Sequence, residues 1–266
     1  EAQAAGEGRR VLVDKYFVGR EVEVDAVCDG ETVLIPGIME HVERAGVHSG
    51  DSMAIYPGLT LSKEEVDTVV DYTTRIGLAL QVKGLMNIQY VIVGGPAYRS
   101  PSSNTGRDKD DATSVYVIEV NPRSSRTIPF ISKVTGVPMV KLAVGAMLGS
   151  SLKDQGYSGG LWRKKPLVAV KAPVFSMSKL SGVDNYLGPE MKSTGEIMGI
   201  DVDFPSAFSK ALIAAGLELR PGGSILLSIA DRDKADVEDM VRRLASFDFS
   251  LYATSGTAEL IRSLDQ

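Results

Sequence analysis

A strand that runs into an acid, an amide and a proline is the feature that most constrains this chain. The apolar residues Val115 to Ile118 predict the strand, and Glu119 and Asn121 follow it two residues apart. Alternate residues of a strand point to the same side, so the acid and the amide share one face. Asn121 and Pro122 are typical of a bend where a strand ends. We therefore expect the sheet to present oxygen atoms at this end.

Arg123 and Arg126 extend the same run and favour a phosphate ligand. Oxygen donors beside basic groups suit Mg²⁺ bound to a polyphosphate, because this ion keeps few protein ligands and takes the rest from phosphate and water. Planar guanidinium groups can then donate to phosphate oxygens. The alternative is an ordinary strand end, in which Asn121 and Pro122 make the bend and the arginines are solvated.

A second strand, Asn87 to Val93, is a candidate partner for the strand Ser114 to Val120. The segment between them is rich in glycine, proline, serine, arginine and aspartate, which is typical of a surface insertion. If the two strands pair antiparallel, Gln89 can lie near Glu119. The register of the pair decides this, and sequence alone does not fix it.

Acidic and apolar residues alternate over Glu21 to Val27, which predicts a strand with one acidic and one apolar face. A further strand, Thr32 to Pro36, follows an Asp-Gly turn, so the region reads as a meander with an acidic face. Residues Glu1 to Arg10 show no periodicity and are expected to be frayed. Structure is expected to begin at Val11.

Helical signals follow. Ser62 to Glu65 form a capping box, and the apolar stripe after it predicts a helix. Thr127 to Leu148 is apolar and interrupted at Gly136 to Pro138, which predicts two helices with a turn between them. After a glycine-rich connector, Leu167 to Lys171 predicts a short strand. Gly182 to Gly199 is expected to be irregular.

The pattern changes in the C-terminal part. Helices are predicted over residues 206–215 and 233–244, and strands over 224–229 and 250–253. This order is a βαβ unit, whose strands run parallel. Thr254 and Thr257 open a last helix, where free amides and the helix dipole favour an anion. Simple N-capping by threonine is the alternative.

Composition narrows the classes of function. A net charge of −5 and a pI near 5.2 disfavour a general nucleic-acid binder, which usually carries a basic patch. The only cysteine, Cys28, rules out an intrachain disulfide and is expected to be a small buried residue. No signal peptide and no apolar run long enough to span a membrane is recognisable, which predicts a cytoplasmic protein without a membrane partner.

Five motifs, in the same order, resemble the large chain of carbamoyl phosphate synthetase. They are Gly37–His41, Gly46–Ser52, Gly84–Gln89, Glu119–Thr127 and Gly188–Glu196. The resemblance covers nearly the whole sequence. It points to the second half of that large chain, which phosphorylates carbamate, because the sequence continues into a stretch similar to the family's C-terminal regulatory domain.

The resemblance implies an α+β ATP-grasp C-terminal subdomain, an antiparallel sheet with helices, over residues 1–150. It implies a connector over 151–205 and a partial α/β domain similar to methylglyoxal synthase over 206–266. The family's other ATP-grasp subdomain, with its glycine-rich phosphate lid, would lie upstream of residue 1. We therefore expect this stretch alone to be inactive and to bind Mg-ATP weakly.

The resemblance also implies a site. Gln89, Glu119 and Asn121 match the ligands of two Mg²⁺ or Mn²⁺ ions, and Arg123 and Arg126 match catalytic arginines on the phosphate side. Positions that match contacts to ATP are Lys15, Phe17, Glu21, Gly46, Val47, His48, Ser49, Gln89 and Glu119. Positions that match the phosphate contacts of a nucleotide monophosphate effector are Ser228, Lys234, Thr254 and Thr257.

Two further ligands of the family have counterparts here. Residues similar to those around a potassium site are Glu21, His41 and Ser52. Some members bind ornithine as an activator through three acids, two of which match Glu43 and Asp51. The third position holds Ala172, so ornithine activation is not expected.

The implied reaction is the ATP-dependent phosphorylation of carbamate to carbamoyl phosphate, for pyrimidine or arginine synthesis. The implied partner is a glutaminase small chain or domain, and the implied assembly is an oligomer. Two other interpretations stay open. One is a different ATP-grasp ligase that joins a carboxylate to an amine, and the other is an effector-binding or scaffold segment without catalytic duty.

Overall fold

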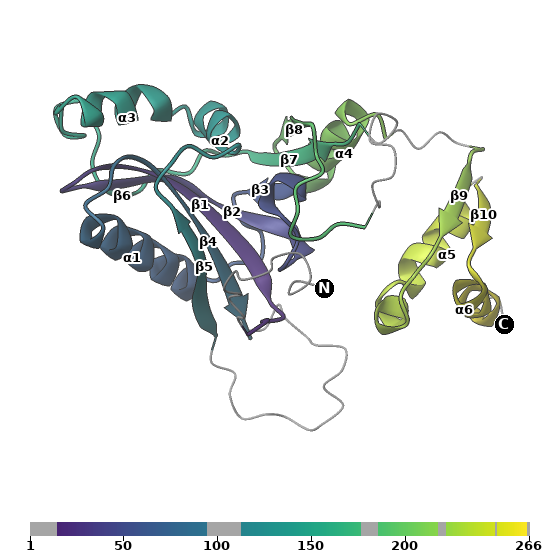
Figure 1. The fold of residues 1–266 in the computed structure, drawn as a ribbon. Coiled ribbons are helices and arrows are strands. Elements are labelled where there is room, and N and C mark those ends of the chain that lie inside the picture. Colours follow the sequence, from purple (N-terminus) through teal and green to yellow (C-terminus); the bar gives the residue numbers. More distant parts are fainter. Residues whose placement is uncertain (1–14, 95–112, 177–185, 218–221, 248, 265–266) are drawn as a thin grey trace, which may run out of the picture.

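An eight-stranded sheet organises most of the chain in the computed structural model, which describes residues 15–94, 113–176, 186–217, 222–247 and 249–264 (Figure 1). Its strands are β1 (Arg20–Asp29), β2 (Val33–Arg44), β3 (Ala54–Tyr56), β4 (Lys83–Val93), β5 (Ser114–Asn121), β6 (Gly160–Leu161), β7 (Val168–Val174) and β8 (Gly195–Asp201). The order is β5-β4-β1-β2-β3-β7-β8, with β6 beside β2. The pairs are antiparallel except β2 with β6.

Helices cover both faces of this sheet. They are α1 (Lys63–Ala79), α2 (Ile128–Thr135), α3 (Met139–Met147) and α4 (Phe204–Ala214). α1 packs on one face in a core that contains Val24 and Ile88, and α2 and α3 pack on the other against Val27 and Met39. α4 lies on β7 and β8. Because both faces are covered, β1 is buried along nearly its whole length.

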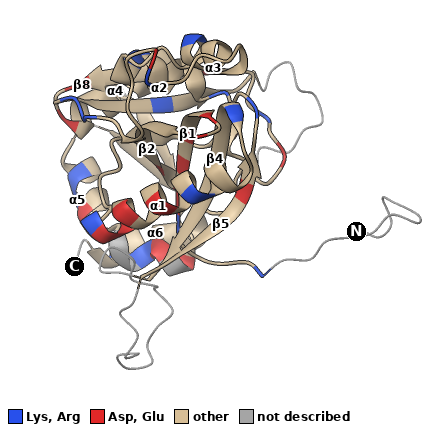
Figure 2. Cartoon of the chain, turned by 90° about the vertical axis from the view of Figure 1, so that its left-hand side faces the viewer, with Lys and Arg blue, Asp and Glu red and all other residues tan. Residues whose placement is uncertain are grey.

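The acidic face of β1 is inside the protein. Alternation turns Glu21, Glu23 and Asp25 away from α1 and toward the side of α2 and α3. These residues are 2%, 2% and 0% exposed. By contrast, most charged residues on helices α1 and α5 (Glu238–Ser246) face solvent and include both signs, with Glu65 of α1 a buried exception (Figure 2). The acids of β1 are therefore not a solvated face, and each needs a partner within the protein.

Local signals in the sequence predicted several elements correctly. Ser62 and Glu65 form the predicted capping box at the start of α1. α2 and α3 are the two predicted helices, and Gly136 ends α2 with a φ of 78°, a conformation that favours glycine. Within the described ranges no single helix is long and apolar enough to cross a membrane; α2 and α3 reach that length only together, across a bend of 110°.

The expectation of irregular structure over residues 182–199 is wrong at its end, because Gly195–Asp201 form β8 and pair with β7. Gly199 has a packing role there. A β-carbon on Gly199 would lie 2.0 Å from the carbonyl oxygen of Ala207 in α4, so the glycine lets this helix lie directly on the strand. Residues 182–185 lie outside the described part of the chain.

A separate sheet forms in the C-terminal part. β9 (Ser224–Leu227) and β10 (Ser250–Ala253) are parallel, which confirms the predicted βαβ order, and α6 (Ser255–Leu264) follows. The predicted helix over 233–244 is wrong at its start, where the 3-10 helix η3 (Asp231–Asp236) precedes α5. Asp231 and Lys234 pair over 2.6 Å, a spacing that suits three residues per turn.

Some expectations stay predictions. The frayed start and most of the insertion between β4 and β5 fall at residues 1–14 and 95–112, outside the described residues. The domain boundaries are also untested. Residues of the expected connector supply β6, β7 and β8 to the large sheet.

Candidate functional site

Two antiparallel strands bring the predicted oxygen ligands together. β4 and β5 pair in a register that sets Gln89 opposite Glu119 and Asn87 opposite Asn121. The expectation that Gln89 and Glu119 lie close is therefore confirmed. Asn121 donates from Nδ2 to Oε1 of Glu119 over 2.8 Å, and Gln89 donates from Nε2 to Oγ of Ser49 over 3.0 Å. An acid and two amides thus gather at one edge of the sheet.

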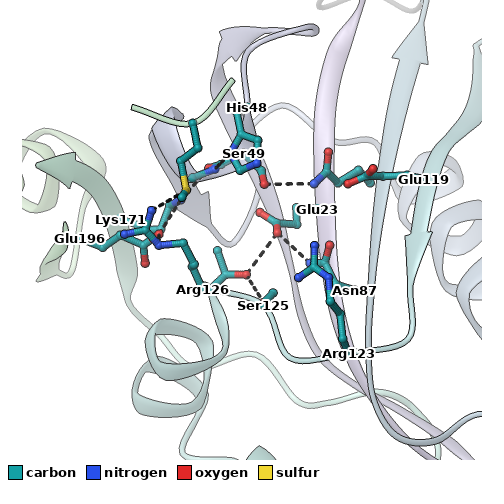
Figure 3. A pocket seen from close by; sticks show the side chains of 14 residues that line it. Glu23, His48, Ser49, Asn87, Glu119, Arg123, Ser125, Arg126, Lys171 and Glu196 are labelled. Atoms are coloured by element: carbon teal, nitrogen blue, oxygen red, sulfur yellow. Dashed lines mark hydrogen bonds and ion pairs between the residues drawn. The ribbon is translucent and has the colours of Figure 1, made fainter. Parts of the chain in front are cut away.

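A cavity of about 280 Å³ opens beside these side chains (Figure 3). The predicted site residues that line it are His48, Ser49, Gln89, Glu119, Arg123 and Arg126. They come from the loop after β2, from β4, from β5 and from the loop that leads to α2. Motifs that are far apart in the sequence therefore meet at one cavity.

A buried acid forms the floor of this cavity. Glu23 lines it from β1, and Nε2 of His41 lies 3.2 Å from one carboxylate oxygen while Asn87 donates to the other over 2.7 Å. Burial alone would raise the pKa of Glu23, but the hydrogen bond and charge of His41 lower it to about 2. Burial would lower the pKa of His41, but Glu21 and Glu23 raise it to about 9. The imidazole is therefore charged at neutral pH.

Asp25 lies beneath the floor and is fully buried. Its carboxylate accepts from Oγ of Ser125 over 2.6 Å, from Nδ2 of Asn87 over 2.9 Å and from Oγ1 of Thr127. Burial and the neighbouring charge of Glu23 raise the pKa of Asp25 to about 7, although its hydrogen-bond donors oppose the rise. Near neutral pH, Glu23 is therefore ionised and Asp25 is partly protonated.

Cations stand on another side of the cavity. Nζ of Lys171, a residue only 1% exposed, donates to the carbonyl oxygen of Ser49 over 2.9 Å. Glu196 lies 3.7 Å from Nζ of Lys171 and 3.6 Å from Nε of Arg126, and burial raises the pKa of Glu196 despite both cations. Nη1 of Arg126 also donates to Oγ of Ser193 over 3.0 Å. The cavity therefore has an acidic floor and a basic wall.

The loop that carries His48 is fastened to the segment before β8. Nδ1 of His48 accepts from the amide of Gly50 over 3.0 Å, which leaves the proton of the neutral ring on Nε2. Asp51 is fully buried and accepts from the amides of Lys192 and Ser193 over 2.8 Å each. These bonds join two of the motifs that carry the family resemblance.

Other predicted contacts lie outside the cavity lining. Those residues are Lys15, Phe17, Glu21, Gly46, Val47 and the predicted metal ligand Asn121, which instead bonds to Glu119. The ring of Phe17 stacks on Tyr116 of β5, with centroids 4.4 Å apart. The hydroxyl of Tyr16 donates to the carbonyl oxygen of Ala45 over 2.7 Å. The segment before β1 and the loop after β2 are thereby held together, next to the sheet edge that carries Glu119.

The predicted effector residues lie in the C-terminal unit. They are Ser228, Lys234, Thr254 and Thr257. Oγ1 of Thr257 is buried, accepts from the amide of Ile229 over 2.9 Å and lies 3.2 Å from the donor hydroxyl of Thr254. Nζ of Lys234 lies 3.0 Å from where a β-carbon of Gly256 would stand, at the start of α6. A cation thus sits beside the N-terminus of this helix.

The donor set at the sheet edge fits a hard cation. Across the described ranges, no three or more His, Cys, Asp or Glu side chains are grouped so as to hold a metal. A site here would combine the carboxylate of Glu119 with the amide oxygens of Gln89 and Asn121. Mg²⁺ takes oxygen ligands and keeps few from protein, so these residues fit an ion that arrives with a phosphate ligand.

Some residues of the cavity were missed at the sequence level: Glu23, Asn87, Lys171 and Glu196. A signal existed for two of them. Asn87 is two residues from Gln89, and Glu23 lies on the acidic face of its strand, so alternation directs both toward the site. Lys171 and Glu196 reach it only because β7 and β8 continue the sheet past β3, which no local pattern indicates.

The comparisons with known proteins agree with one another. Residues 1–155 match the family model for the carbamoyl-phosphate synthase L chain, ATP binding domain. The carbamoyl phosphate synthase large chain of Thermomicrobium roseum is 56% identical over 260 residues, which is 98% of this chain and 22% of the relative. That of Thermoanaerobacter pseudethanolicus is 56% identical over 254 residues, 96% of this chain and 22% of the relative. The chain thus spans about a fifth of the length of these curated relatives.

Solved structures show the same fold at low identity. The biotin carboxylase domain of a single-chain bacterial carboxylase aligns with a TM-score of 0.52 and 15% identity, over 74% of this chain and 46% of that one. N5-carboxyaminoimidazole ribonucleotide synthetase from Thermotoga maritima aligns with a TM-score of 0.51 and 13% identity, over 76% of this chain and 52% of that one. With the family match, this confirms an ATP-grasp domain fold with an antiparallel sheet and helices. The part similar to methylglyoxal synthase stays a prediction.

Proposed function

The chain belongs to the family of carbamoyl phosphate synthase large chains, as part of their ATP-binding region, and we propose that its cavity is one wall of a Mg-ATP site at which carbamate is phosphorylated. The observation that carries the proposal is the register of β4 and β5. It sets Gln89 opposite Glu119 at the mouth of a cavity that Arg123 and Arg126 also line. Oxygen ligands and arginines together are what a metal-bound polyphosphate requires.

Each residue then has a role in aligning and neutralising the phosphoryl group. Glu119, Gln89 and Asn121 would hold two Mg²⁺ or Mn²⁺ ions, which when bound neutralise charge on the transferred phosphate. Arg123 and Arg126 would donate to phosphate and carboxylate oxygens, and buried Lys171 adds positive charge on the same side. Such catalysis needs position and charge rather than a covalent group from the protein.

The proposal extends to the whole enzyme. We assign the region to the second, carbamate-phosphorylating half, because a βαβ unit follows the large sheet as the regulatory domain follows that half in the family. The product would be carbamoyl phosphate for pyrimidine or arginine synthesis. A glutaminase chain or domain would be the partner in a cytoplasmic oligomer.

A potassium site near Glu21, His41 and Ser52 stays a prediction with a specific difficulty. The ring of His41 lies 3.4 Å from Glu21 and 3.2 Å from Glu23. Its positive charge already neutralises the acids that a monovalent cation would use. Carbonyl oxygens of the neighbouring loop would therefore have to supply most of the ligands.

The test of the proposed function is Glu119→Ala in an intact large chain that contains this region. We expect the mutant to lose ATP synthesis from carbamoyl phosphate and ADP while its unfolding midpoint is unchanged. Glu31→Ala removes an exposed acid in the turn between β1 and β2 and serves as the control. Near-normal ATP synthesis by Glu119→Ala would refute the assignment.

A second function, effector binding, is favoured by one observation. Lys234, which also pairs with Asp231, lies beside the N-terminus of α6, where free amides and the helix dipole also attract an anion. We expect UMP to shift the backbone NMR signals of residues 254–257 in this chain, and Mn²⁺ to leave them unchanged. Signals that do not respond to UMP would remove the support for this site.

A further inference from the structure

Asp25 does not line the cavity, but it is hydrogen-bonded to the two residues on either side of Arg126, which does line it. Ser125 and Thr127 donate to its two carboxylate oxygens, and these two residues flank Arg126 in the chain. Ser125 is 100 residues away from Asp25 in sequence. The segment 122–127, between β5 and α2, is thus fastened by its side chains to β1, an inner strand of the sheet.

The anchor is built from groups that cannot easily move. Asp25 is 0% exposed, and Asn87 donates from one nitrogen to Asp25 over 2.9 Å and to Glu23 over 2.7 Å. Thr127 is 2% exposed and also reaches Glu23 over 3.2 Å. A buried carboxyl group costs free energy unless donors surround it, and here the donors belong to the segment that carries the arginines.

The two arginines depend on this anchor to different degrees. The guanidinium of Arg126 is also held by Ser193 and lies 3.6 Å from Glu196, so its head is restrained from the side of β8. Arg123 is exposed and donates to the carbonyl oxygen of Ser124 over 2.9 Å, within its own segment. The orientation of the Arg123 side chain therefore depends on the backbone conformation of the segment 122–127.

We propose that Asp25 is a positioning residue, which holds the segment 122–127 against β1 and thereby aims Arg123 and Arg126 at the cavity. This inference rests on the proposed function only in taking a phosphate group as the ligand of the arginines. The bonds that carry it are independent of any ligand.

The decisive variant is Asp25→Asn, which keeps the shape of the side chain but replaces one acceptor oxygen with a donor. At a pH above 7, where the carboxylate of Asp25 accepts from both hydroxyls, this variant leaves one of the two hydroxyls without that acceptor. The matched control is Glu65→Gln, which alters another buried acid, 3% exposed, at the start of α1 and away from the cavity. Both variants change a buried carboxylate, but only the first touches the arginine segment.

Two measurements on the full chain test the proposal. The first is backbone ¹⁵N relaxation of residues 123–127 without ligand, and the second is the affinity for inorganic pyrophosphate with Mg²⁺. In Asp25→Asn we expect faster local motion confined to these residues and an affinity about tenfold weaker, the equivalent of about 1.4 kcal/mol. We expect neither change in Glu65→Gln.

Ser125→Ala keeps the inference testable if Asp25→Asn does not fold, because Ser125 is only partly buried and its loss leaves two donors on Asp25. We expect the same direction of change in the motion of residues 123–127. Unchanged motion in a folded Asp25→Asn, or in Ser125→Ala where the former does not fold, overturns the inference. A wild-type chain that does not bind Mg-pyrophosphate counts against the proposed function, while the ligand-free relaxation still decides the role of Asp25.

Discussion

The floor and the rim of the cavity use acids in opposite ways. At the floor, Glu23 and the Asp25 that lies beneath it are at most 2% exposed, and His41, Asn87 and nearby hydroxyls satisfy their charge. At the rim, Glu119 is exposed and accepts from Asn121. The protein's own side chains thus balance the charge of the floor acids, whereas the acid at the rim is open to an exchangeable ligand. Floor acids should matter first for folding, and rim acids for binding.

The largest expected effect comes from removing a floor acid. Glu23→Ala leaves the charged ring of His41 with Glu21 as its remaining carboxylate partner, and it deprives Asn87 of an acceptor. We expect the free energy of unfolding to fall by about 3 to 5 kcal/mol, the usual cost of breaking a buried charge pair. Urea denaturation at pH 7 measures this. A loss below about 1 kcal/mol would show that the floor is not a folding element.

The next largest effect is a pH dependence of the free energy of unfolding, which we expect from the buried groups at the floor and not from the rim. The folded pKa of His41, about 9, lies above its usual value of 6.5, so its contribution to stability is complete below pH 6.5 and is lost as pH rises through 9. We expect the free energy of unfolding to fall by on the order of 2 to 3 kcal/mol between pH 6.5 and pH 9.

The chain offers a matched control for this prediction, because His48 is its only other histidine. His41→Gln should remove most of the fall between pH 6.5 and pH 9, leaving only the smaller part that comes from Asp25, whose raised pKa of about 7 lies in the same range. His48→Gln should keep the whole fall. Urea denaturation of the three proteins at both pH values is the measurement. An equal fall in His41→Gln and the wild type would contradict the charge state inferred for the floor.

The smallest effect on folding is expected at the rim. Glu119→Gln replaces an exposed acid by an amide of the same shape, so the free energy of unfolding should change by no more than about 0.5 kcal/mol. Binding of Mn²⁺ in the presence of ADP, measured by electron paramagnetic resonance, should instead be lost or strongly weakened. A variant that is destabilised but still binds the ion would reverse the contrast between rim and floor.

The contrast also explains what sequence could predict. Glu119 and Asn121 were recognisable as candidate ligands because they stand two residues apart at the end of a predicted strand, in the same short run as a proline and two arginines. The strands, the capping box at Ser62 and the break at Gly136 follow from equally local signals. The order of the elements and the family resemblance then placed the run in an ATP-grasp fold.

The rest depends on long-range packing. Sequence showed the acids of β1 but not that helices cover both faces of the sheet and bury them. Lys171 and Glu196 come from strands that join the sheet beyond β3, and β8 was missed because the packing role of Gly199 is visible only against α4. A register or a strand order is set by the whole sheet rather than by a local pattern.

The central claim is that the rim of the cavity holds the metal ions of a bound nucleotide. Anomalous X-ray diffraction from crystals grown with Mn²⁺ and ADP tests it most directly. We expect manganese peaks within coordination distance of oxygens from Glu119, Gln89 and Asn121, close to the distance of about 2.0 to 2.1 Å at which Mg²⁺ binds oxygen. Ordered manganese and nucleotide elsewhere, with the side chains of these three residues turned away from the ions, would contradict it.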